Sequence, residues 1–280
     1  MRERGCAMSE QLAVLHADEA ESARKGLSRL VFSRIYTICL VELQKLRHDR
    51  TELVTRAIQP ALWLVIFGET LTRLRAIPTG NVPYLDYLAP GVIAQSAQFI
   101  AIFFGIQLIW ERDAGVLAKL LVTPTPRVAL VTGKAFAAAL RALIQALVVL
   151  VLAALLGVAL TDDPVKLLVM AVVVILGSMF FCCLSITIAG LALTRDRMTG
   201  IGQAITMPLF FCSSALYPVT LMPGWLQVIN RLNPLGYEVD ALRGLLIGTP
   251  AQLALDFSVL AVASAVMIII ASAQLGRLAR

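Results

Sequence analysis

The sequence predicts an all-α, polytopic membrane protein with six transmembrane helices, an N-terminal amphipathic interface helix and an outer re-entrant helical hairpin. Composition, the spacing of charges and the distribution of lysine and arginine support this fold class. Of the 280 residues, 59% are hydrophobic and only 15% are charged, whereas a soluble domain has roughly 45–50% apolar and about 25% charged residues. A chain with so little polar surface cannot cover itself in water. This excludes an ordinary cytosolic enzyme, a disordered chain and a secreted disulfide scaffold.

The transmembrane helices are predicted from segments that contain no charged residue. A helix that crosses about 30 Å of hydrocarbon needs roughly 20 apolar residues. Five segments are long enough to hold one span each: 87–110, 142–161, 167–194, 198–230 and 257–276. The first span is free of charge only at 57–68, and we expect it to cover 57–72. Glu69 would then pair with Arg73 in the outer headgroup layer, because an acid four residues before a base is the favourable order on a helix.

The segment 198–230 is too long for one straight span and too short for two. Three prolines interrupt it, and we expect the span at about 201–219. Two shorter apolar stretches follow, 221–231 and 235–247, with Asn233-Pro234 between them. Stretches of this length are typical of re-entrant or interfacial helices rather than crossings. The sequence therefore predicts a helical hairpin that dips into the membrane.

The orientation follows from the lysine and arginine residues near the spans, because cytoplasmic loops have an excess of both. With six spans the two termini share one side, and that side holds 18 of these residues against 5 on the other. Arg141 falls inside the third span. Both termini are therefore predicted to be cytoplasmic. This asymmetry accounts for the net charge of +6, and no nucleic-acid partner is predicted.

Three regions are expected along the chain: a flexible cytoplasmic N-terminus at 1–26, an amphipathic interface helix at 27–50 and the six-span domain at 53–280. Residues 27–47 mix apolar and basic side chains, so a helix there would lie flat at the inner headgroup layer. Two roles remain open for this helix. It is either a basic membrane anchor or a contact surface for a cytoplasmic partner.

The predicted cytoplasmic loop 111–134 contains a short amphipathic helix. Leu117, Leu120 and Leu121 share one helical face. Thr123-Pro124-Thr125-Pro126 then ends the helix. Such a helix must bury its apolar face, and the periodicity favours the membrane surface and a protein groove equally.

Polar side chains recur at helical spacing in two of the predicted spans. Amides are costly against lipid, so both stripes are expected to face protein or a cavity. They either form hydrogen bonds between helices or line a path for an amphiphile. The stripe in the second span consists of Gln95, Gln98, Phe99 and Phe103, and the stripe in the fifth consists of Gln203, Thr206, Phe210 and Ser213.

The sequence contains no constellation typical of catalysis, metal binding or nucleotide binding. Thr132-Gly133-Lys134-Ala135 has the Gly-Lys of a phosphate loop but lacks its first glycine and its Ser/Thr. HExxH, GxSxG and paired-cysteine zinc spacings do not occur, which disfavours an intramembrane enzyme. The spans hold almost no ionisable residues. This argues against a proton-coupled carrier and for energy supplied by another chain.

Two groups of residues resemble motifs of the type-2 ATP-binding-cassette permeases. The first resembles the first cytoplasmic loop of that family and consists of Glu111-Arg112, Gly115-Val116-Leu117, Leu120, Thr123-Pro124 and Gly133-Lys134. The second resembles its outer hairpin and consists of Tyr217-Pro218, Met222-Pro223, Asn233-Pro234-Leu235, Tyr237 and Asp240-Ala241-Leu242-Arg243. The similarity covers roughly residues 30–275 and is greatest to the daunorubicin-resistance-like branch of drug and lipid exporters. Val116 stands where the family often has Thr, with little expected effect on coupling.

The resemblance implies a six-span domain that dimerises, as a homodimer or with a sister permease, and pairs with two cytoplasmic ATPase subunits. Those subunits would hold ATP and Mg, and this chain would have no cofactor. The loop helix would dock on the ATPase as a coupling helix, through Glu111, Arg112, Gly115, Leu117, Leu120, Leu121 and Pro124. In the outer hairpin, the resemblance singles out Asn233, Pro234, Tyr237, Asp240 and Arg243. In the family the second and fifth spans line the central path.

These features favour the permease subunit of an ATP-driven exporter in a bacterial cytoplasmic (inner) membrane. Its substrate would be a drug-like or lipid-like amphiphile moved outward, and its neighbours would be membrane lipid, the ATPase and the second permease copy. A lipid-linked polysaccharide is the alternative substrate, although a glycan favours more aromatic side chains along the path. The alternative from another class is a membrane scaffold or channel without an ATPase.

Overall fold

The computed structural model describes residues 50–74, 82–116, 126–192 and 195–278, together with Leu40 and Gln44. All regular secondary structure within these residues is helical, which confirms the predicted all-α class there. The predicted segments 1–26 and 27–50 fall almost entirely outside them. In chain order the helices are α2 (Arg50–Leu62), the π-helix η1 (Trp63–Gly68), α3 (Glu69–Leu74), α4 (Tyr84–Asp113), α6 (Arg127–Leu155), α7 (Pro164–Ala192), α8 (Arg195–Phe211), the 3₁₀ helix η2 (Val219–Leu221), α9 (Gly224–Leu232), α10 (Pro234–Ile247) and α11 (Leu253–Leu278).

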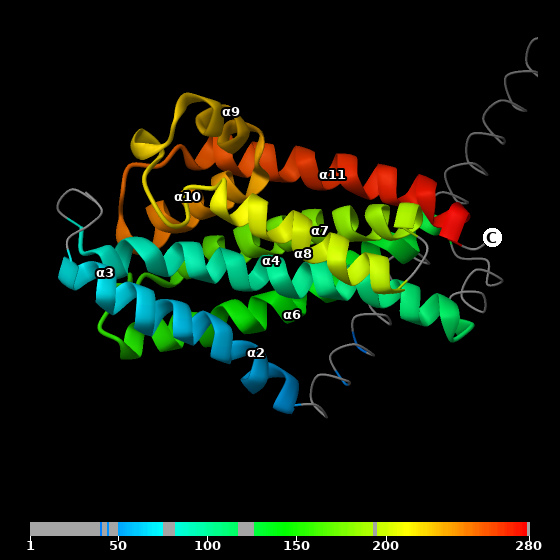
Figure 1. Ribbon diagram of the computed structural model, residues 1–280, viewed down its shortest axis with the longest axis horizontal. Helices are drawn as coiled ribbons and strands as arrows, with labels where there is room; N and C mark the ends of the chain where they lie inside the picture. Colours follow the sequence, from blue (N-terminus) through cyan, green and yellow to red (C-terminus); the bar gives the residue numbers. More distant parts are fainter. Residues whose placement is uncertain are drawn as a thin grey trace, which may run out of the picture.

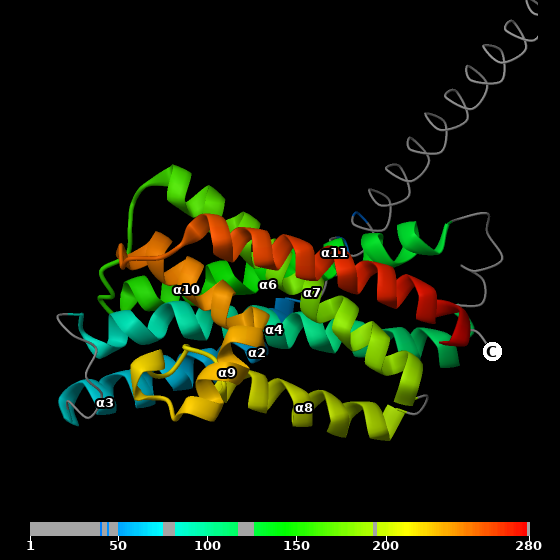
Figure 2. The ribbon, with the colours of Figure 1, turned by 90° about the horizontal axis from the view of Figure 1, so that it is seen from above.

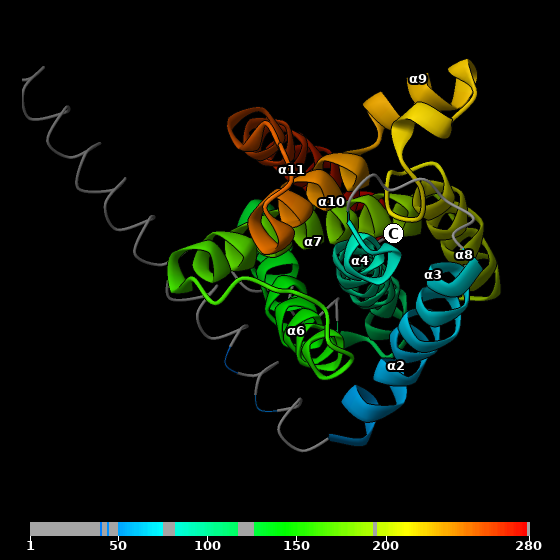
Figure 3. The ribbon, with the colours of Figure 1, turned by 90° about the vertical axis from the view of Figure 1, so that its left-hand side faces the viewer.

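Helix α4 forms the centre of a bundle. It packs against α6, α7, α8 and α10, and η1 also contacts it. Figure 3 looks along the bundle and shows α6, α7, α8 and the α2–α3 segment arranged around α4. In the most apolar stretch of α4, 78% of the residues are buried inside the protein, against 17% in α11. A helix that is apolar on every side is suited to such an interior position, because it has no polar face to turn outward.

Four helices in the described residues are long and apolar enough to cross a membrane (Figure 1). They comprise Tyr84–Asp113, Arg127–Leu155, Pro164–Gly190 and Leu253–Leu275. Each covers most of one predicted charge-free segment, and these four predictions are confirmed as apolar helices of spanning length. The predicted end of the third segment was wrong, because α6 ends at Leu155, before residue 161. Helix α6 begins well before its charge-free segment, and Arg141 therefore lies near its middle rather than at its end.

The first predicted span is a continuous helical segment, because α2, η1 and α3 follow one another without a break. Pro60 lies inside α2 and removes a backbone donor, so the change to wider π-helical turns soon after it has a local cause. The π-helix places Trp63 against Phe210 of α8, with ring centroids 5.7 Å apart. Arg73 and Glu69 form the predicted ion pair at 2.8 Å on the exposed face of α3.

Helix α8 lies alongside α4 (Figure 2) and ends at Phe211, earlier than the predicted span at 201–219. The Ser213 hydroxyl donates to the Phe210 carbonyl at 2.6 Å and accepts from the Ala215 N–H at 3.3 Å. These side-chain bonds replace the backbone partners that would continue the helix. The predicted end was wrong because the apolar character of the sequence continues beyond the last helical residue.

The predicted outer hairpin consists of α9 and α10, two short helices that meet at Asn233. The Asn233 side chain accepts a hydrogen bond from the Leu235 N–H at 3.1 Å, and Pro234 is the first residue of α10. A capping asparagine followed by proline is a favourable helix start. Gly248 follows α10 with a φ of +71°, the left-handed conformation that glycine adopts at helix ends. Helix α10 packs against α4, α7 and α11 and so belongs to the bundle.

Candidate functional site

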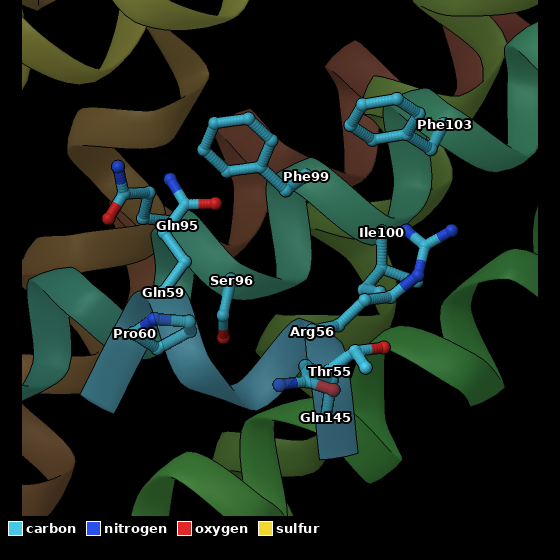
Figure 4. A pocket seen from close by; sticks show the side chains of 10 residues that line it. All are labelled: Thr55, Arg56, Gln59, Pro60, Gln95, Ser96, Phe99, Ile100, Phe103 and Gln145. Carbon is cyan, nitrogen blue, oxygen red and sulfur yellow. The ribbon is translucent and has the colours of Figure 1, made fainter. Parts of the chain in front are cut away.

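A cavity of about 320 Å³ lies between α2, α4 and α6. Its volume is at the lower end of the range for small-molecule sites, about 300–1,000 Å³. Three of the predicted pathway residues, Gln95, Phe99 and Phe103, line it. The full lining consists of Thr55, Arg56, Gln59, Pro60, Gln95, Ser96, Phe99, Ile100, Phe103 and Gln145 (Figure 4).

Two buried glutamines reach the cavity without completing their hydrogen bonds. Gln95 is 2% exposed and Gln145 is 1% exposed. Among the described residues, Nε2 of Gln95 and both amide atoms of Gln145 have no hydrogen-bond partner. Buried polar atoms are normally paired, since an unpaired one costs about 1–3 kcal/mol. The cavity wall therefore offers hydrogen-bonding groups that a ligand can use.

Two aromatic rings and one cationic side chain also line the cavity. Phe99 and Phe103 lie one turn apart on α4, and their stacked rings have centroids 6.4 Å apart. The Arg56 guanidinium carbon lies 5.4 Å from the centroid of Phe103, a favourable cation–π arrangement. Figure 4 shows this side chain extending toward Phe103 and Ile100. Arg56 is the one charged residue among the described residues that line the cavity.

The other predicted pathway residues do not line this cavity. Gln98 is fully buried elsewhere on α4, and its amide atoms have no hydrogen-bond partner within the described part of the chain. On α8, Gln203 is exposed, whereas Thr206 is buried and donates to the Gly202 carbonyl at 2.6 Å. The buried face of α8 passes through Gly202, Thr206 and Phe210 rather than through Gln203. A pathway role for the α8 stripe stays a prediction.

An ion pair joins the two ends of the predicted coupling loop. Lys134, in the second turn of α6, donates to both carboxylate oxygens of Glu111 near the end of α4. Lys134 is only 7% exposed, and its Nζ also lies 5.7 Å from the ring centroid of Phe104. The pair is therefore shielded from solvent. It ties α4 to α6 where the loop leaves and re-enters the bundle.

The remaining residues of the predicted coupling site are only partly described. Arg112 forms an ion pair with Asp113 at 2.9 Å. Gly115 has a φ of +72° just after α4 ends, a conformation that favours glycine because it has no Cβ. The leucine face expected to contact the ATPase stays a prediction. Leu117, Leu120, Leu121 and Pro124 lie outside the described residues.

A polar network fixes α10 to the bundle at the other end of the molecule. Arg243 of α10 is 7% exposed, pairs with Asp240 at 3.1 Å and donates to the Ser214 carbonyl at 2.8 Å. Its guanidinium carbon lies 3.8 Å from the ring centroid of Tyr87 on α4. Tyr87 donates to the same Ser214 carbonyl at 3.1 Å. The motif residues Asp240 and Arg243 therefore connect three segments that are distant in the sequence.

The other hairpin residues make bonds within the same region. Asn233 Nδ2 donates to the Leu209 carbonyl of α8 at 2.6 Å. The Tyr237 hydroxyl donates to the Arg231 carbonyl of α9 at 2.8 Å. Pro234 begins α10, as described above. The predicted hairpin residues thus connect the hairpin to α8 and α4 and its two helices to one another.

Residues 33–247 match the family model described as ABC-2 type transporter. This match covers most of the chain, including the helices around the cavity, the loop between α4 and α6, and the hairpin. The chain belongs to the ABC-2 type transporter family. The family resemblance that the loop and hairpin motifs indicated is confirmed.

This permease is similar to several relatives over most of their length. The chain is 31% identical to the putative transport permease ycf38 of Cyanophora paradoxa, over 71% of this chain and 69% of that protein. It is 27% identical to the probable doxorubicin resistance ABC transporter permease protein DrrC of Mycobacterium tuberculosis, over 74% of this chain and 75% of that protein. It is 25% identical to the daunorubicin resistance ABC transporter permease protein DrrB1 of Streptomyces coeruleorubidus, over 72% and 71%. The prediction of an ABC exporter permease is confirmed.

The permease also contains a buried carboxyl group that sequence analysis did not identify. Glu238 of α10 is 0% exposed, and neither of its carboxylate oxygens has a hydrogen-bond partner among the described residues. It lies against Gly177 of α7, where a Cβ atom would overlap the carboxylate. An unpaired ionised carboxylate is costly in such surroundings, so the neutral acid is favoured. In the same described part of the chain, no three His, Cys, Asp or Glu residues are grouped so that they could hold a metal ion.

Proposed function

We propose that this ABC-2 type permease exports a hydrophobic or amphiphilic molecule, drug-like or lipid-like, across the bacterial cytoplasmic membrane. A separate ATP-binding subunit supplies the energy and holds ATP and Mg. A second permease copy, identical or related, completes the membrane domain. The observation that supports this most directly is the cavity between α2, α4 and α6, where buried amides adjoin aromatic rings.

The size of the cavity favours a small amphiphile over the alternative of a lipid-linked polysaccharide. A volume of about 320 Å³ matches drug-sized ligands and is far too small to enclose a glycan chain. Two relatives are named for resistance to doxorubicin and daunorubicin, which supports a small-molecule substrate for this chain as well.

Six crossings with both termini in the cytoplasm fit the helices. Besides the four long apolar helices, the α2–η1–α3 segment runs unbroken over residues 50–74, which at 1.5 Å per residue spans roughly 37 Å. Helix α8 packs beside α4, and with its shorter apolar stretch, Gly200–Phe211, it is the fifth crossing in this proposal. Trp225 and Leu232 of α9 are exposed apolar side chains. A helix with such a face enters the membrane interface, as expected of a hairpin that dips into lipid.

The ATP-binding subunit acts on the loop between α4 and α6 in this proposal. The shielded Glu111–Lys134 pair joins the two ends of that loop, so a displacement of the loop is passed to both helices together. Gln95 on α4 and Gln145 on α6 line the cavity. The loop is therefore mechanically connected to two of the three walls of the binding site.

Transport into proteoliposomes tests the proposed function. The full chain is reconstituted with its ATP-binding subunit facing outward, and a fluorescent amphiphile is expected to accumulate inside only when ATP is hydrolysed. An ATP-binding subunit that cannot hydrolyse ATP is the negative control. Gln145→Leu should lower the transport rate several-fold, because it removes the unpaired amide from the cavity. Gln227→Leu on α9 is the matched control, since its amide bonds the Met222 carbonyl outside the cavity.

The outcome also separates the competing function classes. Flux of the amphiphile that does not depend on ATP would favour a channel, and no transport of any amphiphile by the assembled complex would contradict the export proposal.

A further inference from the structure

The π-helical part of the first crossing is fixed to the bundle. Leu64 of η1 is fully buried and belongs to the hydrophobic core. Trp63 packs against Phe210 of α8, and Gly68 lies so close to α4 that a Cβ there would overlap the Leu85 side chain. Residues 63–68 are therefore held against two neighbouring helices, α4 and α8.

Helix α2, which precedes this anchored part, faces the cavity instead. Within residues 55–62 of α2, only Pro60 is buried. The inward face of α2 therefore borders a space of about 320 Å³, whereas the inward face of η1 is packed into the core. The residues of α2 that line the cavity are Thr55, Arg56, Gln59 and Pro60.

The boundary between these two parts of the crossing is a weak point of the helix. Pro60 lies inside α2 and has no N–H, so it removes one backbone hydrogen bond from the helix. The wider π-helical turns begin at Trp63. Sharp bends in helices occur at proline and at π-helical turns, and hinges are short segments that absorb a change of backbone angles. Residues 60–68 combine both features between a cavity-lining helix and an anchored one, so they have the local structure of a hinge.

The outward face of α2 leaves room for such a movement. Ile58 and Leu62 are exposed apolar side chains on this helix, and Figure 3 shows α2 at the periphery of the bundle, outside α4. In a membrane these side chains meet lipid tails, which are about as apolar as leucine itself. An outward swing of α2 therefore exchanges one apolar contact for another, and it opens the cavity toward the lipid.

We propose that α2 is a lid of the cavity, hinged at residues 60–68, which swings outward during the transport cycle and opens the cavity to the surrounding lipid. In the closed position seen here, the Arg56 guanidinium carbon lies 5.4 Å from the ring centroid of Phe103 on the α4 wall. An amphiphile dissolved in the membrane reaches or leaves the cavity through this opening without crossing water. This inference rests on the proposed export function and names the route between its binding site and the membrane.

Distances between pairs of spin labels test the lid. The full chain, with its native cysteines replaced by serine, is assembled with its ATP-binding subunit in nanodiscs. Labelled permease is diluted with unlabelled permease, so that most complexes contain one labelled copy. The test pair joins Thr51→Cys, near the start of α2, to Leu147→Cys on the exposed face of α6. The control pair joins Ile66→Cys of the anchored η1 to Leu155→Cys at the end of α6, and both side chains are exposed.

The two pairs should respond differently to ATP. Each is measured without nucleotide and with ATP bound to an ATP-binding subunit that cannot hydrolyse it. The 13 residues of α2 form a helix about 20 Å long, and a bend of about 20° at one end displaces the other end by about 7 Å. The distance between the labels at positions 51 and 147 should therefore change by about 5 Å or more. The distance between positions 66 and 155 should stay constant.

Substitution of the proline tests the position of the hinge. Pro60→Ala restores the missing backbone donor, so it should abolish most of the change between positions 51 and 147 and lower ATP-driven transport several-fold. Pro208→Ala is the matched control, because Pro208 also lies inside a helix, α8, but is exposed and does not line the cavity. It should leave the distance change and the transport rate as in the wild type. Co-purification with the ATP-binding subunit establishes that each variant is assembled.

The lid is refuted if the distance between positions 51 and 147 is the same in both states. Equal changes in the two label pairs would also refute it, because the whole crossing would then move as one body. A full change in Pro60→Ala would refute the hinge. ATP-driven export by a complex whose α2 does not move would leave the export function standing, whereas a moving α2 without any ATP-driven transport would contradict that function instead.

Discussion

The Glu111–Lys134 ion pair is shielded from solvent, so the loss of one partner should affect stability. Replacing one partner leaves the other charge buried, which typically costs about 3–5 kcal/mol. Lys134→Gln is therefore expected to lower the melting temperature of the purified permease strongly. Adding Glu111→Gln should recover most of the loss, because no buried charge remains. Thermal melts of the wild type, both single variants and the double variant in one detergent measure the coupling between the two sites.

The exposed Glu69–Arg73 pair is the control for this comparison of single and double variants. Its side chains are 60% and 78% exposed, and exposed pairs contribute only about 0–1 kcal/mol. Arg73→Gln should therefore change the melting temperature little. Additive losses in the Glu111→Gln, Lys134→Gln double variant would contradict the predicted coupling.

Substitutions at Gly177 and Glu238 are also expected to have coupled effects on stability. A Cβ at position 177 would overlap the Glu238 carboxylate, so Gly177→Ala should destabilise the permease by about 1–3 kcal/mol through overpacking. In a Glu238→Ala background the space is free, and alanine is the better helix former. The same glycine substitution should then cost little or become favourable. Equal losses in the two backgrounds, measured by thermal melts, would show that the cost of alanine at position 177 does not come from overlap with the Glu238 carboxylate.

At the scale of elements, the loop between α4 and α6 is predicted to transmit the force of the ATP-binding subunit. Moving a two-state equilibrium from 1:99 to 99:1 takes about 5.5 kcal/mol, so the contact at this loop must be firm. Leu120→Asp places a charge in the leucine face and should reduce ATP-driven transport by at least about tenfold while the permease stays folded. On the predicted helix Lys119 lies opposite the leucines, so Lys119→Asp should have a much smaller effect. ATP hydrolysis and transport are measured in the same proteoliposomes, and unchanged transport by Leu120→Asp would count against a coupling helix.

The positions of helices were predicted from the sequence more accurately than their ends. Charge-free segments identified α4, α6, α7 and α11, because hydrocarbon excludes unpaired charges over a whole crossing. The end of α8 depends instead on the hydrogen bonds of Ser213 with Phe210 and Ala215, which hydropathy does not reflect. The hairpin helices were predicted because Asn233-Pro234 is a local start signal that needs no tertiary contact.

At the scale of the whole molecule, the sequence identified one wall of the cavity and missed the other two. Gln95, Phe99 and Phe103 share a face of α4, so helical spacing alone was sufficient for them. Arg56 and Gln145 come from α2 and α6. A single sequence does not show which residues of those helices pack beside a given turn of α4. Glu238 was missed for the same reason, since its burial depends on how α10 packs against α7.

The number of crossings decides on which side of the membrane the coupling loop lies. If α2–η1–α3 and α8 did not cross and the termini stayed in the cytoplasm, the four long helices would leave the α4–α6 loop outside and the α6–α7 turn inside. That arrangement would place Arg112, Arg127 and Lys134 at the outer side of the membrane, against the preference of basic residues for the cytoplasm. With six crossings and cytoplasmic termini, the α4–α6 loop lies in the cytoplasm and the α6–α7 turn lies outside. In a chain whose native cysteines are replaced by serine, Asp162→Cys should therefore react with an impermeant maleimide in spheroplasts, whereas Ala118→Cys should react only after the membrane is permeabilised. The opposite labelling pattern would rule out six crossings with cytoplasmic termini, and with them a coupling loop within reach of an ATPase in the cytoplasm.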